Sequence, residues 1–203
     1  MKSVLFLTFA IVGWAGQVQA QYFDKTYSLA LDINKPLSNT DFVNQVSARG
    51  FKFGYREMIN ERIFGGIDFT NTTYDSYEPR KTYTSGTSAI TTDLYNYAYS
   101  YGLTLSFDYF FKIEQKLMPY AGLGVGASYI NYSQYFNVYS NKYDSWGVLV
   151  RPQAGVIYRL KEDAGWALQA AVHYDYSSAK SQELDLKAFQ NMGVQVGVII
   201  LNW

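Results

Sequence analysis

Cysteine is absent from this chain of 203 residues, and only one histidine is present. Without cysteine there can be no disulfide, no thiolate metal site and no lipid anchor on a cysteine side chain. A single histidine also excludes a metal site built from several histidines. Basic and acidic residues number 17 each, so the zero net charge gives no indication of a nucleic-acid partner.

A long apolar run is also missing, because no segment after the N-terminus approaches the ~20 apolar residues of a membrane-spanning helix. At the N-terminus, Lys2 precedes an apolar run from Val4 to Ala15, and Val18-Gln19-Ala20 is an acceptable cleavage site. About twelve apolar residues are too few to span a bilayer. We therefore predict that residues 1–20 are a cleaved signal peptide and that residues 21–203 form one exported domain.

Aromatic residues, by contrast, are abundant: they make up 18% of the chain and include 20 tyrosines. Between Tyr95 and Phe111 every odd-numbered residue is large and apolar or aromatic, whereas the residues between them, apart from Phe110, are small or polar. This period of two predicts a β-strand with one apolar and one polar face. A closed barrel of about eight strands holds only modest side chains inside. The bulky face is therefore expected to point outward, into lipid.

The same alternation recurs along the chain. We expect eight strands, at about residues 26–34, 46–57, 62–74, 95–111, 118–138, 147–160, 166–176 and 189–203. Short charged connections at residues 58–61, 113–117 and 161–165 alternate with longer polar ones at residues 35–45, 75–93, 139–146 and 177–188. This pattern predicts an all-β fold, an eight-stranded antiparallel up-and-down transmembrane β-barrel. Short turns are periplasmic in such barrels, so residues 114–116 should face the periplasm and residues 85–88 the exterior.

Eight alternating strands, an N-terminal signal, the glycine-alternating stretch from Pro119 to Ala127 and the terminal Trp203 resemble a known family. This is the small outer-membrane β-barrel family of OmpA-, OmpX- and OmpW-type proteins. The resemblance implies an integral protein in the outer membrane of a Gram-negative bacterium, surrounded by lipid and lipopolysaccharide. Trp203 resembles the C-terminal signal that the barrel assembly machinery reads. No functional motif carries over, so the resemblance assigns no catalytic, cofactor-binding or metal-binding residue and no cofactor.

Charged side chains are expected to face the lumen at eight positions: Asp32, Lys52, Arg56, Asp68, Asp108, Arg151, Arg159 and Asp175. Charges buried in a narrow barrel need partners or water. The four acids and four bases could pair into a plug, or they could line a polar conduit for small solutes. We favour the plug, because eight strands leave little free bore. Gly122, Gly124 and Gly126 should give Arg151 room to reach acids across the barrel.

His173 and Asp175 lie side by side on one face of the seventh expected strand. A His–carboxylate pair can act as a general base. Outer-membrane lipid A deacylases, which resemble the chain in fold, carry a His-x-Ser pair. Here Asp175 occupies the second position after His173, and Ser177 comes two residues later. The pair also points into the lumen and not toward lipid, so we expect an interior histidine with satisfied hydrogen bonds and no enzyme activity.

Tyrosines gather in the outer parts of the third to sixth expected strands and their loops: Tyr74, Tyr77, Tyr83, Tyr95, Tyr97, Tyr132, Tyr135, Tyr139 and Tyr143. A membrane crossing needs only about 9–11 residues per strand, and the fourth and fifth strands are longer. Their outer ends should stand above the bilayer as a β-wall whose edges could pair with a partner's strand. The alternative is an ordinary aromatic girdle that continues into polar loops.

The sequence thus predicts a monomeric outer-membrane barrel with a charged, plugged lumen and a structural or surface-interaction role. Any surface ligand would bind the long loops. Three alternatives remain: a narrow channel or carrier for small solutes, a lipid-modifying enzyme, and a soluble lipocalin-like carrier. The enzyme would need a lipid-facing set of Ser, His and acid, which the sequence lacks. The lipocalin-like carrier would have to pack the bulky face of residues 95–111 inward.

Overall fold

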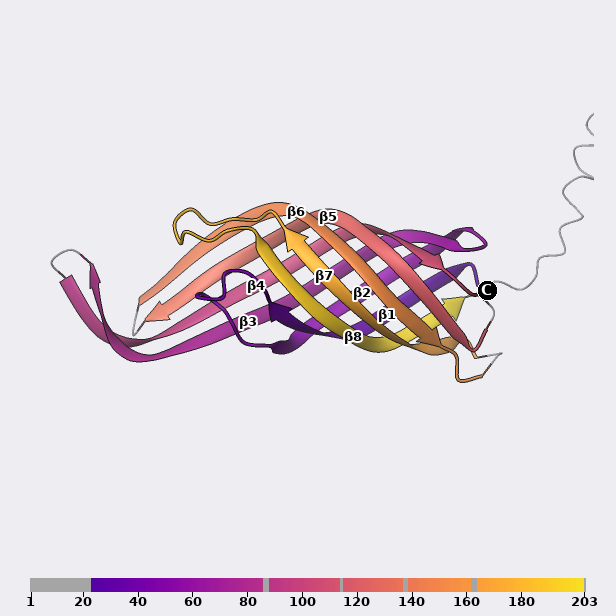
Figure 1. Ribbon diagram of the computed structural model, residues 1–203, viewed down its shortest axis with the longest axis horizontal. Coiled ribbons are helices and arrows are strands. Elements are labelled where there is room, and N and C mark those ends of the chain that lie inside the picture. Colours follow the sequence, from indigo (N-terminus) through magenta and orange to yellow (C-terminus); the bar gives the residue numbers. More distant parts are fainter. Residues whose placement is uncertain (1–22, 86–87, 114, 137–138, 162–163, 203) are drawn as a thin grey trace, which may run out of the picture.

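The computed structural model describes residues 23–85, 88–113, 115–136, 139–161 and 164–202. Its strands follow one another around a closed barrel (Figure 1): β1 (Lys25–Pro36), β2 (Ser47–Asn60), β3 (Ile63–Ser85), β4 (Ser88–Phe110), β5 (Leu117–Phe136), β6 (Tyr139–Tyr158), β7 (Trp166–Ser177) and β8 (Phe189–Asn202). Neighbouring strands are antiparallel, and β1 closes the ring by pairing with β8. The predicted all-β, eight-stranded antiparallel up-and-down barrel is confirmed.

Several predictions fall on residues that the structure does not describe. The predicted signal peptide, residues 1–20, and the terminal Trp203 lie outside the described residues. The same is true of residues 86 and 87, which are expected at the exterior end, and of residue 114, which is expected at the periplasmic end. Within the described ranges, no helix is long and apolar enough to cross a membrane.

Side chains alternate between the two faces of the barrel wall, as the sequence predicts. On β4, Leu103, Leu105 and Phe107 expose 56%, 61% and 55% of their surface. Thr104 and Ser106, between them, expose 3% and 1%. Every strand adds large exposed side chains to this apolar belt, among them Leu31, Phe53, Ile67, Leu105, Leu123, Val148, Val172 and Val196. The bulky face of β4 points outward, so the lipocalin-like packing is excluded.

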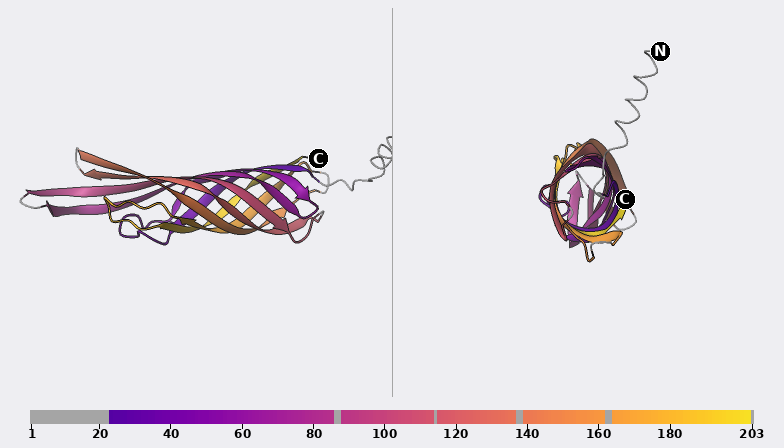
Figure 2. Two further views of the ribbon diagram at one scale, coloured as in Figure 1. Left: turned by 90° about the horizontal axis from the view of Figure 1, so that it is seen from above. Right: turned by 90° about the vertical axis from the view of Figure 1, so that its right-hand side faces the viewer.

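Four neighbouring strands extend beyond the rest of the barrel. β3 and β4 each have 23 residues and β5 and β6 each have 20, whereas β1 and β7 have 12. Figure 2 shows them as two arms, the β3–β4 hairpin and the β5–β6 hairpin. The loops predicted at residues 75–93 and 139–146 are therefore wrong, because paired strands occupy most of both segments. Their threonines and tyrosines favour strands and pair across them, as the rings of Tyr77 and Tyr95 do.

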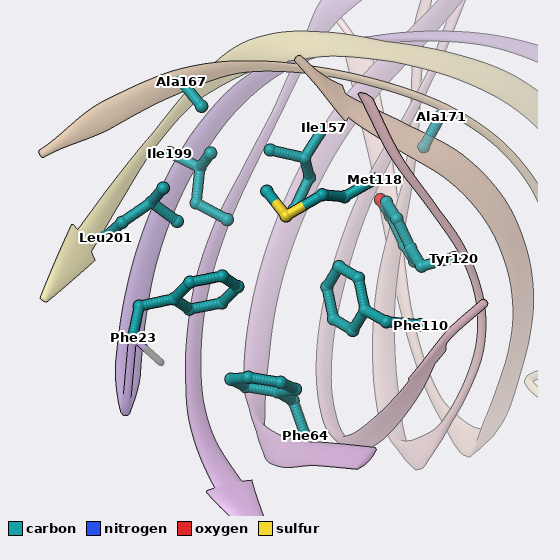
Figure 3. Packing of buried hydrophobic residues seen from close by; sticks show 10 residues of the cluster. All are labelled: Phe23, Phe64, Phe110, Met118, Tyr120, Ile157, Ala167, Ala171, Ile199 and Leu201. Atoms are coloured by element: carbon teal, nitrogen blue, oxygen red, sulfur yellow. The ribbon is translucent and has the colours of Figure 1, made fainter. Parts of the chain in front are cut away.

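Apolar side chains close the lumen at the end where the short turns lie (Figure 3). This lower apolar layer consists of Phe23, Phe64, Phe110, Met118, Tyr120, Ile157, Ala167, Ala171, Ile199 and Leu201. The rings of Phe23 and Phe64 stack with centroids 5.2 Å apart, and Phe110 packs edge-on against Phe64 at 5.1 Å. Residues 199–201 are apolar on both faces, so their orientation could not be predicted from the sequence. Ile199 and Leu201 turn inward to join this layer.

A second apolar layer closes the opposite end of the lumen. This upper apolar layer consists of Phe42, Val43, Tyr74, Ala98, Ile130, Tyr132, Ala179 and Phe189. Phe42 and Val43 belong to the loop between β1 and β2, and Ala179 belongs to the loop between β7 and β8. Tyr74 and Tyr132, which the sequence assigned to an exposed wall or girdle, are instead 1% and 0% exposed. They occupy inward positions on their strands, and the two loops cover them.

The two loops are tied together by Asn39. Its side-chain nitrogen donates a hydrogen bond to the carbonyl oxygen of Lys187 at 2.9 Å, and its side-chain oxygen accepts one from the Lys187 N–H at 3.0 Å. Asn39 adopts a left-handed backbone conformation with φ of 54°, which asparagine tolerates better than most residues. The loops therefore form one folded cover over the upper apolar layer.

Candidate functional site

A polar layer separates the two apolar layers and holds most of the predicted lumen charges. All eight predicted residues are buried, with at most 7% of their surface exposed: Asp32, Lys52, Arg56, Asp68, Asp108, Arg151, Arg159 and Asp175. Arg159 lies just after β6, where its N–H donates to the carbonyl oxygen of Lys116 at 2.8 Å. The other seven residues form two charged clusters.

The first charged cluster is centred on Arg56. Two guanidinium nitrogens of Arg56 donate to the two oxygens of Asp68 at 2.9 and 2.8 Å, and Nε donates to Asp108 at 2.8 Å. Lys52 Nζ lies 3.3 Å from an oxygen of Asp68 and donates to Gln153 at 2.8 Å. Gln153 in turn donates to Asp108 at 2.7 Å. Two cations thus balance two carboxylates, and the bonds tie β2, β3, β4 and β6 together across the lumen.

The second charged cluster is centred on Arg151. Its Nε and Nη2 atoms each lie 2.5 Å from an oxygen of Asp175, and Nη2 lies 3.6 Å from Asp32. His173 bridges the same two acids, with Nε2 2.8 Å from Asp32 and Nδ1 3.2 Å from Asp175. Gln195 donates to Asp32 at 3.4 Å. This cluster links β1, β6, β7 and β8, so the two clusters together cross-link every strand except β5.

The predicted role of the β5 glycines is wrong. A Cβ atom on Gly122 would lie 1.9 Å from a carboxylate oxygen of Asp108, and one on Gly124 would lie 2.8 Å from the hydroxyl of Ser106. The atoms nearest to Gly122 and Gly124 therefore include β4 side chains and do not include Arg151, and a Cβ atom on Gly126 would meet the β4 backbone at Leu103. Arg151 finds Asp175 on β7 instead, because the register of β6 and β7 sets these two residues opposite each other.

His173 is an interior side chain, 5% exposed, with both ring nitrogens at hydrogen-bond distance from a carboxylate. Ser177 is hydrogen-bonded to Ser128, with the two hydroxyl oxygens 2.6 Å apart, and not to the histidine. The His–Ser arrangement of lipid A deacylases is therefore not formed. Among the residues that the structure describes, no group of three or more His, Cys, Asp or Glu side chains is placed to hold a metal ion.

A small cavity lies between the first charged cluster and the lower apolar layer. Its volume is about 20 Å³, and its lining includes Lys52, Arg56, Asp108, Tyr120 and Gln169. Such a volume holds one water molecule. The sequence places Gln153 and Gln169 on inward faces but does not predict which groups they contact. Their inward position was the available signal, since a long amide can bridge charged groups inside a narrow lumen.

A row of aromatic residues marks the upper limit of the apolar belt on the long strands. Tyr101, Tyr129 and Trp146 are cross-strand neighbours on β4, β5 and β6, with ring centroids 6.0 and 4.9 Å apart. Beyond this row the outward positions carry polar residues, such as Asn131 and Asp144, together with further tyrosines, such as Tyr77 and Tyr95. Such rows are typical of the boundary between lipid and water. The two arms therefore lie beyond the belt.

The barrel is similar to solved structures of bacterial outer-membrane proteins. Neisserial surface protein A (NspA) is 16% identical, covers 87% of this chain and 96% of its own, and has a TM-score of 0.53. Outer membrane protein W of E. coli is 14% identical over 90% of this chain and 100% of its own, with a TM-score of 0.46. Ail of Yersinia pestis, in complex with the heparin analogue sucrose octasulfate, is 14% identical over 89% of this chain and 100% of its own, with a TM-score of 0.47.

No protein-family model matches the sequence, and no curated protein is significantly similar to it. At such low identity, the likeness to the solved structures concerns the fold alone. It agrees with the resemblance found in the sequence. The chain therefore has the fold of the small eight-stranded outer-membrane β-barrel proteins.

Proposed function

We propose that this chain is an integral outer-membrane protein that is closed to solutes along its lumen and acts through the two arms at its outer end. The proposal is supported chiefly by the contrast between the two surfaces of the barrel wall. The outer surface carries an apolar belt on every strand, whereas the inner surface carries paired charges between two apolar layers.

The apolar belt supports placement in a membrane. Exposed apolar areas of this extent are unfavourable in water, and a closed barrel satisfies its backbone hydrogen bonds without solvent. Barrels of this kind occur in bacterial outer membranes. The predicted signal peptide, residues 1–20, is consistent with export to that membrane, and the strand that ends in Trp203 would engage the barrel assembly machinery.

The layers within the lumen favour a closed barrel rather than a narrow channel or carrier. An ion crossing it would have to pass two apolar layers and separate the Arg56–Asp68 and Arg151–Asp175 pairs. Separating a buried pair costs about 3–5 kcal/mol when one partner is removed. With the lumen closed, the arms become the part of the molecule that is available for contacts outside the cell. We therefore assign the protein a surface-interaction role and no enzymatic activity.

Conductance in planar lipid bilayers tests this function. The wild-type protein, folded and inserted, should show no steady current, while a conducting porin in the same bilayer serves as positive control. Insertion is verified separately by the heat-dependent gel mobility of a folded barrel. A steady single-channel current through the inserted wild type would contradict the closed lumen and favour the channel.

A further inference from the structure

The outer surface of the barrel wall has a groove across β2, β3 and β4, near the turn between β2 and β3. The volume of the groove is about 410 Å³, and its lining includes Tyr55, Ile59, Gly65, Ile67, Leu105 and Phe107. Volumes of this size are typical of small-molecule sites. Leu105 and Phe107 belong to the apolar belt, with 61% and 55% of their surface exposed. The groove therefore opens toward the surroundings of the belt and not into the lumen.

Gly65 keeps this groove open. It occupies an outward position of β3 and lies directly between Glu57 of β2 and Phe107 of β4. Because glycine has no side chain, the wall is hollowed at this position. A Cβ atom on Gly65 would lie 2.7 Å from Cδ1 of Ile59 and 3.2 Å from the ring of Phe107. Even a methyl group would therefore narrow the floor of the groove.

A pair of opposite charges lies at one end of the groove. Glu57 lines the groove, and Lys25 of β1 lies directly opposite Glu57 of β2, with Nζ 3.6 Å from a carboxylate oxygen. Both side chains are exposed, with 42% and 56% of their surface accessible. An ammonium group has three N–H donors and a carboxylate has two acceptor oxygens, so each group can bind a further partner. The groove thus begins at a cation and an anion that lie side by side.

The charged pair lies at the lower limit of the apolar belt. Tyr27 and Tyr55, the next outward pair along β1 and β2, have ring centroids 5.2 Å apart. Tyrosines are enriched at the boundary between lipid and water. The hydroxyl of Tyr55 donates to Glu57 at 3.3 Å, so its polar end is directed toward the charged pair. Lys25 and Glu57 are therefore at the level of lipid headgroups, whereas the groove continues to Leu105 within the belt.

We propose that this groove binds one phosphatidylethanolamine molecule of the periplasmic leaflet. The primary ammonium of the lipid donates to Glu57, its phosphate accepts from Lys25, and one acyl chain lies over Gly65 toward Leu105. This headgroup matches the charged pair in both signs. Phosphatidylcholine, by contrast, has no N–H to donate, and phosphatidylglycerol has no cation. The inference rests on the proposed function, since the membrane placement puts this end of the wall in the periplasmic leaflet.

Native mass spectrometry of the folded barrel, released from detergent micelles, tests the inference. Phosphatidylethanolamine, phosphatidylcholine and phosphatidylglycerol with identical acyl chains are titrated separately. The wild type should bind phosphatidylethanolamine roughly three- to fivefold more tightly than the other two, as expected for one exposed charge pair. Glu57→Gln should bind phosphatidylethanolamine no better than phosphatidylcholine, because the charge that attracts the ammonium is lost. Lys25→Gln should weaken the binding of all three lipids, because each carries a phosphate.

A matched control is Asp144→Asn, which removes one exposed carboxylate beyond the aromatic row at the other end of the belt and should leave the preference unchanged. Gly65→Ala should weaken all three lipids without changing their order. Folding of every variant is verified by heat-dependent gel mobility.

Equal binding of phosphatidylethanolamine and phosphatidylcholine by the wild type, tighter binding of phosphatidylglycerol, or a preference that persists in Glu57→Gln would overturn the inference. In those outcomes the proposed membrane protein still stands. A chain that does not insert into lipid at all contradicts the proposed function itself.

Discussion

Removal of the Arg151 charge should destabilise the barrel strongly. The side chain is 2% exposed, both of its hydrogen bonds to Asp175 measure 2.5 Å, and it also lies 3.6 Å from Asp32. Arg151→Ala leaves two carboxylates buried with His173 as their remaining shared partner. Breaking a buried pair costs about 3–5 kcal/mol, so we expect a loss of this order in the free energy of unfolding, less whatever entering water recovers. Urea titration of the protein folded in lipid vesicles, followed by tryptophan fluorescence, measures the loss.

Two further variants separate the lost charge from the lost volume. Arg151→Met keeps much of the side-chain volume, so most of the destabilisation should persist if the charge is its cause. Asp175→Asn added to Arg151→Met should restore part of the stability, because it removes one of the unpaired carboxylates. Lys112→Ala, at an exposed turn, should be neutral. A cost below about 1 kcal/mol for Arg151→Met would refute the reasoning, since exposed ion pairs cost that little.

Three other changes test the faces, the orientation and the loop cover. Leu105→Arg should lower the free energy of unfolding in lipid by about 2–4 kcal/mol, whereas Ser106→Arg should prevent folding by adding a cation to the first charged cluster. Equal urea stability of the two variants would mean that the faces are assigned wrongly. Arg80→Cys should react with an impermeant maleimide on intact cells and Gln115→Cys should not; labelling at Gln115 alone would reverse the orientation. Asn39→Ala should weaken the packing of the loop cover by about 1–3 kcal/mol, which would be measured as faster protease cleavage within the loops. Unchanged cleavage would contradict the stabilising role of the Asn39–Lys187 hydrogen bonds.

The sequence predicted the strands and their faces because the signal is local. A period of two needs no knowledge of neighbouring strands, so Leu105 and Ser106 could be assigned to opposite faces from the sequence alone. The pairing of the lumen charges is different. Whether Arg151 meets Asp175 depends on the register between β6 and β7, and Asp32 comes from the other end of the chain. The sequence could identify the charged residues but not their partners.

The ends of the lumen were visible in the sequence as breaks in the pattern. Phe64 and Phe110 stand at inward positions where small or polar residues were expected, and residues 199–201 are apolar on both faces. Each break proved to be a member of the lower apolar layer. The sequence carries no such signal for Phe42 of the upper apolar layer, because Phe42 lies in a loop, where no two-residue period fixes the direction of a side chain. An apolar residue at an inward position of a barrel strand therefore indicates where the lumen closes, whereas closure by a loop is recognised only once the loop is seen folded.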